Sequence, residues 1–165
     1  MDWITRERPK IDRVACPWLI TRFLDPAAVF HFVPPEEVQE RARVLGATPF
    51  DVEGVELSHD GPRCSFDAFL SKYRLEDAAL HVVADIVRGA DTARLDLAPQ
   101  CAGLLAVSLG LSQLFTDDHV MLRQGFVVYD ALYAWARYAQ AEAHTWNPQR
   151  GQVMSPSRHP APPRA

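Results

Sequence analysis

Residues 11–23, I-D-R-V-A-C-P-W-L-I-T-R-F, decide how the N-terminal half of the chain folds. Pro17 fits the first position of a helix, because the N–H that proline lacks has no helical partner there. This predicts that Cys16 lies at or next to the N-cap, where the helix dipole favours a thiolate. The pattern therefore predicts Cys16 as a catalytic thiol. The alternative is that Cys16 is a small buried hydrophobe.

Two arginines flank this cysteine, and an acidic residue far along the chain is a partner for one of them. Arg13 precedes the predicted helix and Arg22 follows Trp18 by one turn, so both guanidinium groups could reach one tetrahedral oxyanion. Asp130 interrupts the apolar run F-V-V-Y-D-A-L-Y-A-W, where a carboxylate needs an arginine or a metal ion beside it. We therefore predict Arg13, Arg22 and Asp130 as binding residues. The alternative is that the arginine stems only cover apolar surface.

Composition indicates one globular domain of a chain that works in a reducing compartment. The 165 residues are 48% hydrophobic and 23% charged, and the net charge of -4 gives no general attraction to nucleic acid. Three cysteines without metal-site spacing suit the cytoplasm better than a disulfide framework. We find no secretory signal, no membrane-spanning stretch and no glycine loop for a nucleotide. We expect a cytoplasmic protein without membrane insertion, direct nucleic-acid contact or a nucleotide cofactor.

The order of the predicted elements indicates an α+β fold that is predominantly helical. A short apolar strand spans 29–33, and a hairpin over 48–52 and 55–59 completes a small sheet in the N-terminal half. Periodic segments predict a packing helical bundle over 35–45, 65–73, 77–88, 99–114 and 118–143, with Gly89 as a stop and Gly125 as a bend. We expect one domain over 1–145. The proline-rich stretch 146–165 is predicted to be a disordered tail.

Three further residues suggest a metal site. His81 and Asp85 stand four apart on a predicted helix, and His59 ends a predicted strand. Together they would form an open site for a divalent metal ion such as Zn, Fe or Mn. The alternatives are a solvated helix face for the first two and a backbone-bonded turn histidine for His59. Asp91, in G-A-D-T, is interpreted as a turn residue.

Four stretches in order carry a specific resemblance to a known family. They are D-R-V-A-C-P-W-L-I-T-R-F-L-D-P, F-D-V-E-G-V-E-L-S-H-D-G-P-R-C-S-F-D, I-V-R-G-A-D-T and V-Y-D-A-L-Y-A-W. Together they resemble the C-terminal domain of the chromate resistance protein ChrB over roughly residues 3–139. The resemblance implies a role in chromate resistance or chromate-responsive regulation beside a membrane exporter. Longer members carry an N-terminal part thought to bind DNA. We expect this chain to lack that part and therefore not to regulate by DNA contact.

Two classes of function remain open, and we favour the first. In the first, the chain is an accessory or sensory domain of this stress response that binds a small anion such as chromate or sulfate, a divalent metal, or both, and acts on a partner. That partner is a second copy or a regulatory protein. In the second, the chain is a small metal- or thiol-dependent enzyme for a sulfur-containing or oxidised molecule.

Overall fold

The N-terminal strand β1 (Asp2–Arg6) is the central strand of a small parallel sheet in the computed structural model, which describes residues 1–143. β2 (Val29–Val33) and β3 (Thr48–Pro49) pair with it on opposite sides, both in parallel. Parallel neighbours need a crossover between them, and helices fill both crossovers. The sheet therefore brings the first residues of the chain into the middle of the fold.

The strand at 29–33 is confirmed, but the predicted hairpin over 48–52 and 55–59 is wrong. β3 ends at Pro49, and the next residues form turns and bends with one backbone bond from Asp51 N to Leu57 O at 2.8 Å. Asp51 and Gly54 have positive φ angles of 49° and 82°, which turn the chain out of an extended path. This loop follows β3 directly and leads to His59.

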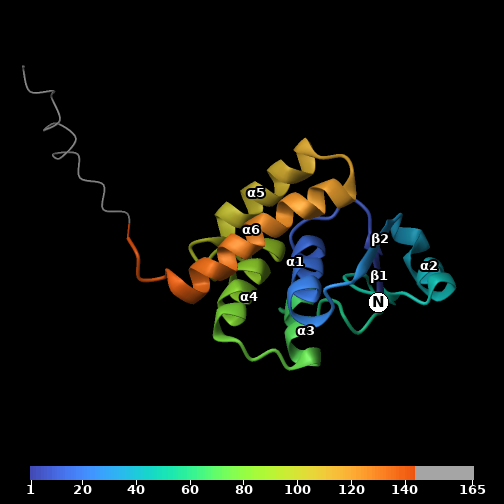
Figure 1. The fold of residues 1–165 in the computed structure, drawn as a ribbon, viewed down its shortest axis with the longest axis horizontal. Coiled ribbons are helices and arrows are strands. Elements are labelled where there is room, and N and C mark those ends of the chain that lie inside the picture. The colour runs from blue at the N-terminus through green and yellow to red at the C-terminus, as the bar shows by residue number, and fades with distance from the viewer. Residues whose placement is uncertain (144–165) are drawn as a thin grey trace, which may run out of the picture.

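The predominantly helical α+β class is confirmed. Figure 1 shows α1 between the sheet and the long helix α6, with α4 and α5 beside α6 and α2 beyond the sheet. The helical segments are α1 (Asp12–Leu19), the π-helix η1 (Ile20–Leu24), the 3-10 helix η2 (Pro35–Glu37), α2 (Val38–Leu45), α3 (Ser65–Tyr73), α4 (Ala78–Asp91), α5 (Cys101–Leu114) and α6 (Asp118–Tyr138).

Two glycines predicted as a helix stop and a bend instead allow close packing. Gly89 lies inside α4, and a Cβ there would collide with the Sγ of Cys101 on α5. A Cβ on Gly125 of α6 would collide with Val14 on α1. Glycine is therefore required at both positions because a neighbouring helix approaches, and α4 continues to Asp91.

The main core forms around the indole ring of Trp18, which is 1% exposed. Aromatic rings from three other segments surround it at centroid distances of 5.6 to 6.4 Å; they are Phe23, Phe66, Tyr129 and Tyr133. Buried aromatic rings dominate the energetics of such a core. α1 is thereby fixed against both α3 and α6.

The predicted tail over 146–165 lies outside the described residues. Within residues 1–143, no helix has the length and apolar character needed to cross a bilayer.

Candidate metal centre

Three side chains from distant parts of the chain converge where α1, the loop after β3 and the end of α4 meet. Asp12, His59 and Asp91 each offer one ligand atom, and the three atoms lie within 4.8 Å of one another. Nε2 of His59 is 3.1 Å from Oδ2 of Asp91 and 3.5 Å from Oδ2 of Asp12. The spacing of these atoms is close enough for one cation to bridge them after small side-chain movements.

Asp12 is the buried member of this cluster. It is the first residue of α1, and its side chain is 1% exposed. Its Oδ2 accepts a 2.6 Å hydrogen bond from the backbone N–H of Ser65, the first residue of α3. Its Oδ1 is buried and has no hydrogen-bond partner among the described residues. A buried carboxylate oxygen without a partner is costly, so this atom is suited to a ligand.

Asp51 lies beside the cluster and is held by many donors. Its Oδ1 accepts from Oγ of Ser65 at 2.7 Å and lies 3.5 Å from Nε2 of His59. Its Oδ2 lies 2.8 Å from Nη2 of Arg6 and 3.2 Å from Nε of Arg13. Asp51 is therefore saturated by the protein itself, in contrast to Asp12, and orients His59.

The pKa shifts also distinguish Asp51, whose pKa is lowered, from Asp12 and Asp91, whose pKa values are raised. Burial, and then the charges of Asp91 and Asp51, raise the pKa of Asp12 well above its usual value. Burial and the charge of Asp51 also raise the pKa of Asp91. Although burial opposes ionisation of Asp51, hydrogen bonds from His59 and Ser65 lower its pKa. The hydrogen bond to Asp51, supported by the charges of Asp12 and Asp91, raises the pKa of His59 to about 9.

This charge pattern favours a cation. Asp12 and Asp91 place two carboxylates close together, and among the described residues the His59 imidazolium lies within 3.5 Å of both. A divalent ion would replace that proton with two positive charges and satisfy the free oxygen of Asp12. His59 is 41% exposed and, with Asp51, lines a pocket of about 280 Å³, so its imidazole is accessible to an ion from solvent.

The predicted set of His59, His81 and Asp85 needs correction, because the structure brings only His59 into the cluster. His81 and Asp85 lie on the exposed face of α4, and Asp85 pairs with Arg88 on the same helix. Among the described residues these three do not form a group of converging ligand atoms. The physical reason is their position on α4. The apolar residues of this helix form the face that packs on the core, whereas His81 and Asp85, four residues apart, lie together on a face exposed to water.

The prediction that Cys16 lies at a helix N-cap as an exposed thiol is wrong. α1 begins at Asp12, so Cys16 is in its middle and Pro17 is inside the helix. The Cys16 side chain is 0% exposed, and burial, followed by the charge of Asp12, raises the pKa of its thiol. Proline inside a helix removes one hydrogen bond, a cost that the burial of Trp18 and its neighbours offsets. Cys16 is a core residue.

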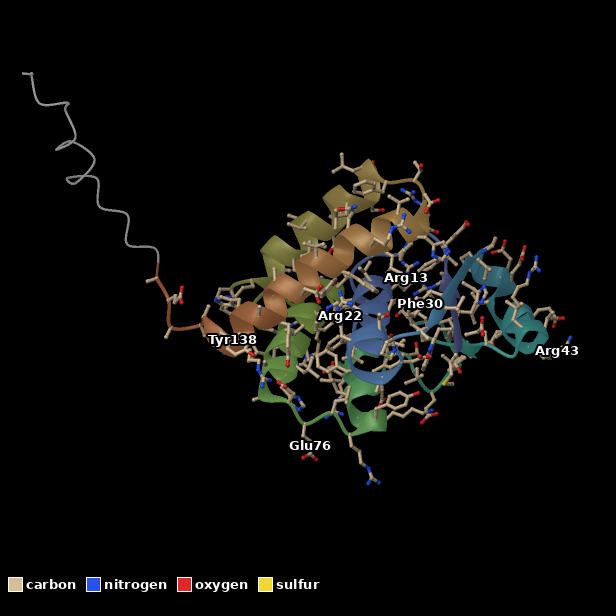
Figure 2. The ribbon with its side chains drawn as sticks, viewed as in Figure 1. Arg13, Arg22, Phe30, Arg43, Glu76 and Tyr138 are labelled. Carbon is tan, nitrogen blue, oxygen red and sulfur yellow. The ribbon has the colours of Figure 1, made fainter. Side chains whose placement is uncertain are left out.

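Arg13 and Arg22 are each engaged by a different carboxylate. Arg22 forms a two-point ion pair with Asp130, with Nε to Oδ1 at 2.9 Å and Nη2 to Oδ2 at 2.7 Å. The predicted pairing of Asp130 with an arginine is thus observed, and Trp18 Nε1 also donates to Asp130 at 2.8 Å. Arg13 instead faces Asp51, nearer the sheet (Figure 2). Their role in binding an anion stays a prediction.

Sequence reasoning missed Asp12, Asp51 and Asp91. Asp91 had a simpler local explanation as a turn residue, whereas Asp12 lay outside the helix whose start Pro17 predicted, and no pattern singled out Asp12 or Asp51. The signal that could have identified these three residues is their position in the stretches that carry the family resemblance. Asp12, Asp51 with His59, and Asp91 lie in three of the four stretches that carry the family resemblance. The fold brings these stretches together at one point.

Comparison with known proteins gives a match over nearly the whole domain. The model of the family described as ChrB, C-terminal domain, matches residues 3–136. Protein ChrB from Cupriavidus metallidurans is 34% identical over 132 residues, which cover 79% of this chain and 39% of the relative. The chain thus matches about two fifths of the length of that protein. No solved structure matches.

Proposed function

Because the chain belongs to the ChrB C-terminal domain family, we propose that it acts in chromate resistance as an accessory or sensory domain that binds a divalent metal ion. The observation that carries the metal is the convergence of one ligand atom each from Asp12, His59 and Asp91. The buried Oδ1 of Asp12, which has no hydrogen-bond partner among the described residues, adds support. The family supports the chromate-related role, and the cluster supports the ligand.

Asp12, His59 and Asp91 would hold the ion, with Asp51 orienting the imidazole. Two carboxylates and one imidazole suit Zn, Fe or Mn. Because His59 and Asp91 are partly exposed, at 41% and 19%, the solvent side is free for water or another ligand. An open position lets a bound ligand exchange, as a sensory site and a catalytic site both require, whereas structural metal sites are closed.

Calorimetric titration of the purified, chelator-treated protein with Zn²⁺, Mn²⁺ and anaerobic Fe²⁺ tests this function. We expect stoichiometric binding of at least one ion, and loss of binding in His59→Gln. His81→Gln is the matched control, because it removes an imidazole from α4 outside the cluster and should bind as the wild type does. A wild type that binds none of the three ions, or equal binding by His59→Gln, would refute the metal site.

Oxyanion binding is the second part of the proposal. Arg22 is 44% exposed and could engage a tetrahedral anion if it shared its guanidinium with Asp130. Arg13 and Arg22 face different carboxylates, so one anion bridging both requires rearrangement. Titration with sulfate and chromate, with and without metal, tests it. Binding that Arg22→Ala abolishes supports the proposal, and absence of binding at millimolar anion in both conditions refutes it.

A metal-dependent enzyme remains the alternative to a binding domain. Its support is the open solvent side of the same cluster. The thiol-dependent form has less support, because Cys16 and Cys64 are buried and burial raises the pKa of both thiols. Turnover that follows metal occupancy would favour the enzyme.

A further inference from the structure

Helix α5 has an apolar outer face that the described fold leaves uncovered. Its fourteen residues, C-A-G-L-L-A-V-S-L-G-L-S-Q-L, contain no charged side chain. Val107 and Leu114 are 45% and 75% exposed. Figure 1 shows α5 at the edge of the helical layer, away from the sheet. An apolar helical face of this kind is characteristic of an interaction surface.

Two glycines on this face have no explanation within the described fold. A Cβ added to Gly103 or Gly110 would meet no atom of the described residues within 4 Å, and neither has a positive φ. Gly89 and Gly125 differ, because a packed neighbour excludes a side chain from each. Glycine inside a helix costs about 1 kcal/mol relative to alanine. A close contact from outside the described chain would account for Gly103 and Gly110.

The spacing of the two glycines and the two large apolar residues is compatible with a helix as that contact. Gly103, Val107, Gly110 and Leu114, which we call the α5 seam, follow one another at intervals of four, three and four residues. This is the a/d spacing by which one helix packs along another. The small residues at 103 and 110 form holes, and the large residues at 107 and 114 form knobs.

We propose that the α5 seam packs against the α5 seam of a second copy, antiparallel, across a two-fold axis between Val107 and Gly110. In this register Val107 faces Gly110 of the second copy, and Leu114 faces Gly103 of the second copy. Every knob thus meets a hole. No other register about a two-fold axis matches all four positions in this way.

Two further observations favour a second copy as the occupant. A two-fold axis brings the same four positions of both copies into the interface, so an unpaired charge on the seam would be buried there twice, and the seam has none. Gly103 and Val107 also line an apolar groove of about 430 Å³ between α5 and α6, with Leu132 and Trp135 on its other wall. Leu114 of the second copy would lie over this groove.

The test measures the oligomeric state of the full chain by light scattering and sedimentation, with and without metal. The wild type should be a dimer. Val107→Glu and Gly110→Lys should each weaken the dimer by about a hundredfold, since each buries two uncompensated charges. Val44→Glu, an exposed valine on α2, is the matched control and should leave the dimer intact. Circular dichroism checks that every variant is folded.

Mixing the variants tests the register. Val107→Glu mixed with Gly110→Lys should form a heterodimer, because the introduced charges face each other across the axis. Val107→Glu mixed with Gly103→Lys should not, since residue 103 of the second copy lies about two helical turns from Val107 in this register. A monomeric wild type, a dimer that Val107→Glu leaves unchanged, or equal rescue by both mixtures would each overturn the proposal. Metal titration does not measure the oligomeric state, so the proposal of a dimer and the proposal of a metal site can be refuted separately.

Discussion

Ser65 donates its backbone N–H to Oδ2 of Asp12 at 2.6 Å, so the first residue of α3 holds the first residue of α1. The N-terminus of α3 stabilises one oxygen of this carboxylate through its N–H and its dipole. The other oxygen is left without a partner. Asp12 is therefore held in one orientation, although only one of its two oxygens has a hydrogen-bond donor among the described residues. This difference affects both the stability of the protein and its metal binding.

Asp12→Asn should stabilise the metal-free protein while it weakens metal binding. Burial and the neighbouring acids raise the pKa of Asp12, so at neutral pH its ionisation opposes folding, and removing the charge should add roughly 1 kcal/mol to the free energy of unfolding. With saturating metal the order should reverse, because only the wild type gains binding energy. Urea unfolding with and without metal measures both. A variant that is less stable in both conditions would contradict this account.

Metal affinity should rise with pH up to about 9. His59 has its pKa raised to about 9, so below that pH a metal must displace a proton from the imidazole. The association constant should increase by at least about tenfold per pH unit between neutral pH and 9, because any protons held on Asp12 and Asp91, whose pKa values are also raised, add to the one displaced from His59. A histidine with an ordinary pKa of 6.5 would lose its contribution about two and a half units lower. Titrations with Mn²⁺ in buffers of different ionisation enthalpy give the affinity and the number of protons released. A constant affinity above pH 7 would contradict the prediction.

Asp130→Ala should cost more stability than Asp130→Asn. Alanine leaves the indole N–H of the buried Trp18 without an acceptor, which costs about 1 to 3 kcal/mol, whereas asparagine retains an oxygen. The ion pair with Arg22 is 44% exposed on both sides and contributes at most about 1 kcal/mol. Because Arg22 lowers the pKa of Asp130, that contribution is present above the unfolded pKa and is lost as pH falls through the folded one. Equal costs at neutral pH would contradict the role of Trp18.

Gly125→Ala should destabilise the chain by about 1 to 3 kcal/mol, because the added methyl group collides with Val14. Val14→Ala in the same chain should recover part of the loss by making room. Gly103→Ala is the matched control, since it adds the same methyl group to a helix with no described neighbour within 4 Å. In dilute protein it should be stabilising by about 0.5 to 1 kcal/mol. Similar losses at both positions would show that close packing of α1 and α6 is not the reason for Gly125.

The three cysteines should be unreactive in the folded protein. Cys16, Cys64 and Cys101 are all buried, and thiol reagents require an accessible thiolate. Labelling with a chromogenic disulfide reagent should be slow in buffer and rapid in denaturant, with three thiols released in total. Fast reaction of one thiol in the native protein would restore the thiol hypothesis.

Local signals in the sequence were sufficient for most helices but not for the site. Asp77 and Asp117 cap α4 and α6 through their own side chains, and Gly46 ends α2 with a φ of 63°, so these boundaries follow from neighbouring residues. The need of Asp130 for a partner also followed, because a carboxylate in an apolar run requires one, but the sequence left an arginine and a metal ion as equal alternatives and the structure identifies Arg22. Helix boundaries depend on a few adjacent residues, and the need of Asp130 for a partner depends on the apolar residues around it.

The metal cluster could not be derived in the same way. His59 and Asp12 are 47 residues apart in sequence, and their approach depends on a parallel sheet whose central strand was not predicted. Cys16 was misplaced because Pro17 is a strong local signal for a helix start, while the true start at Asp12 is fixed by the distant N–H of Ser65. Tertiary contacts overrode the local preference at both places.

The position of β1 at the centre of the sheet affects how the chain folds during synthesis. β1 and α1 leave the ribosome before the rest of this domain, but their partners follow much later. β1 needs Val29–Val33 and Thr48–Pro49, Ile11 receives its hydrogen bond from Tyr129, and Arg22 pairs with Asp130. Contacts with such long sequence separation form slowly. The apolar N-terminal segment therefore stays exposed until α6 has emerged, and its protection by a chaperone at the ribosome would limit aggregation of the nascent domain.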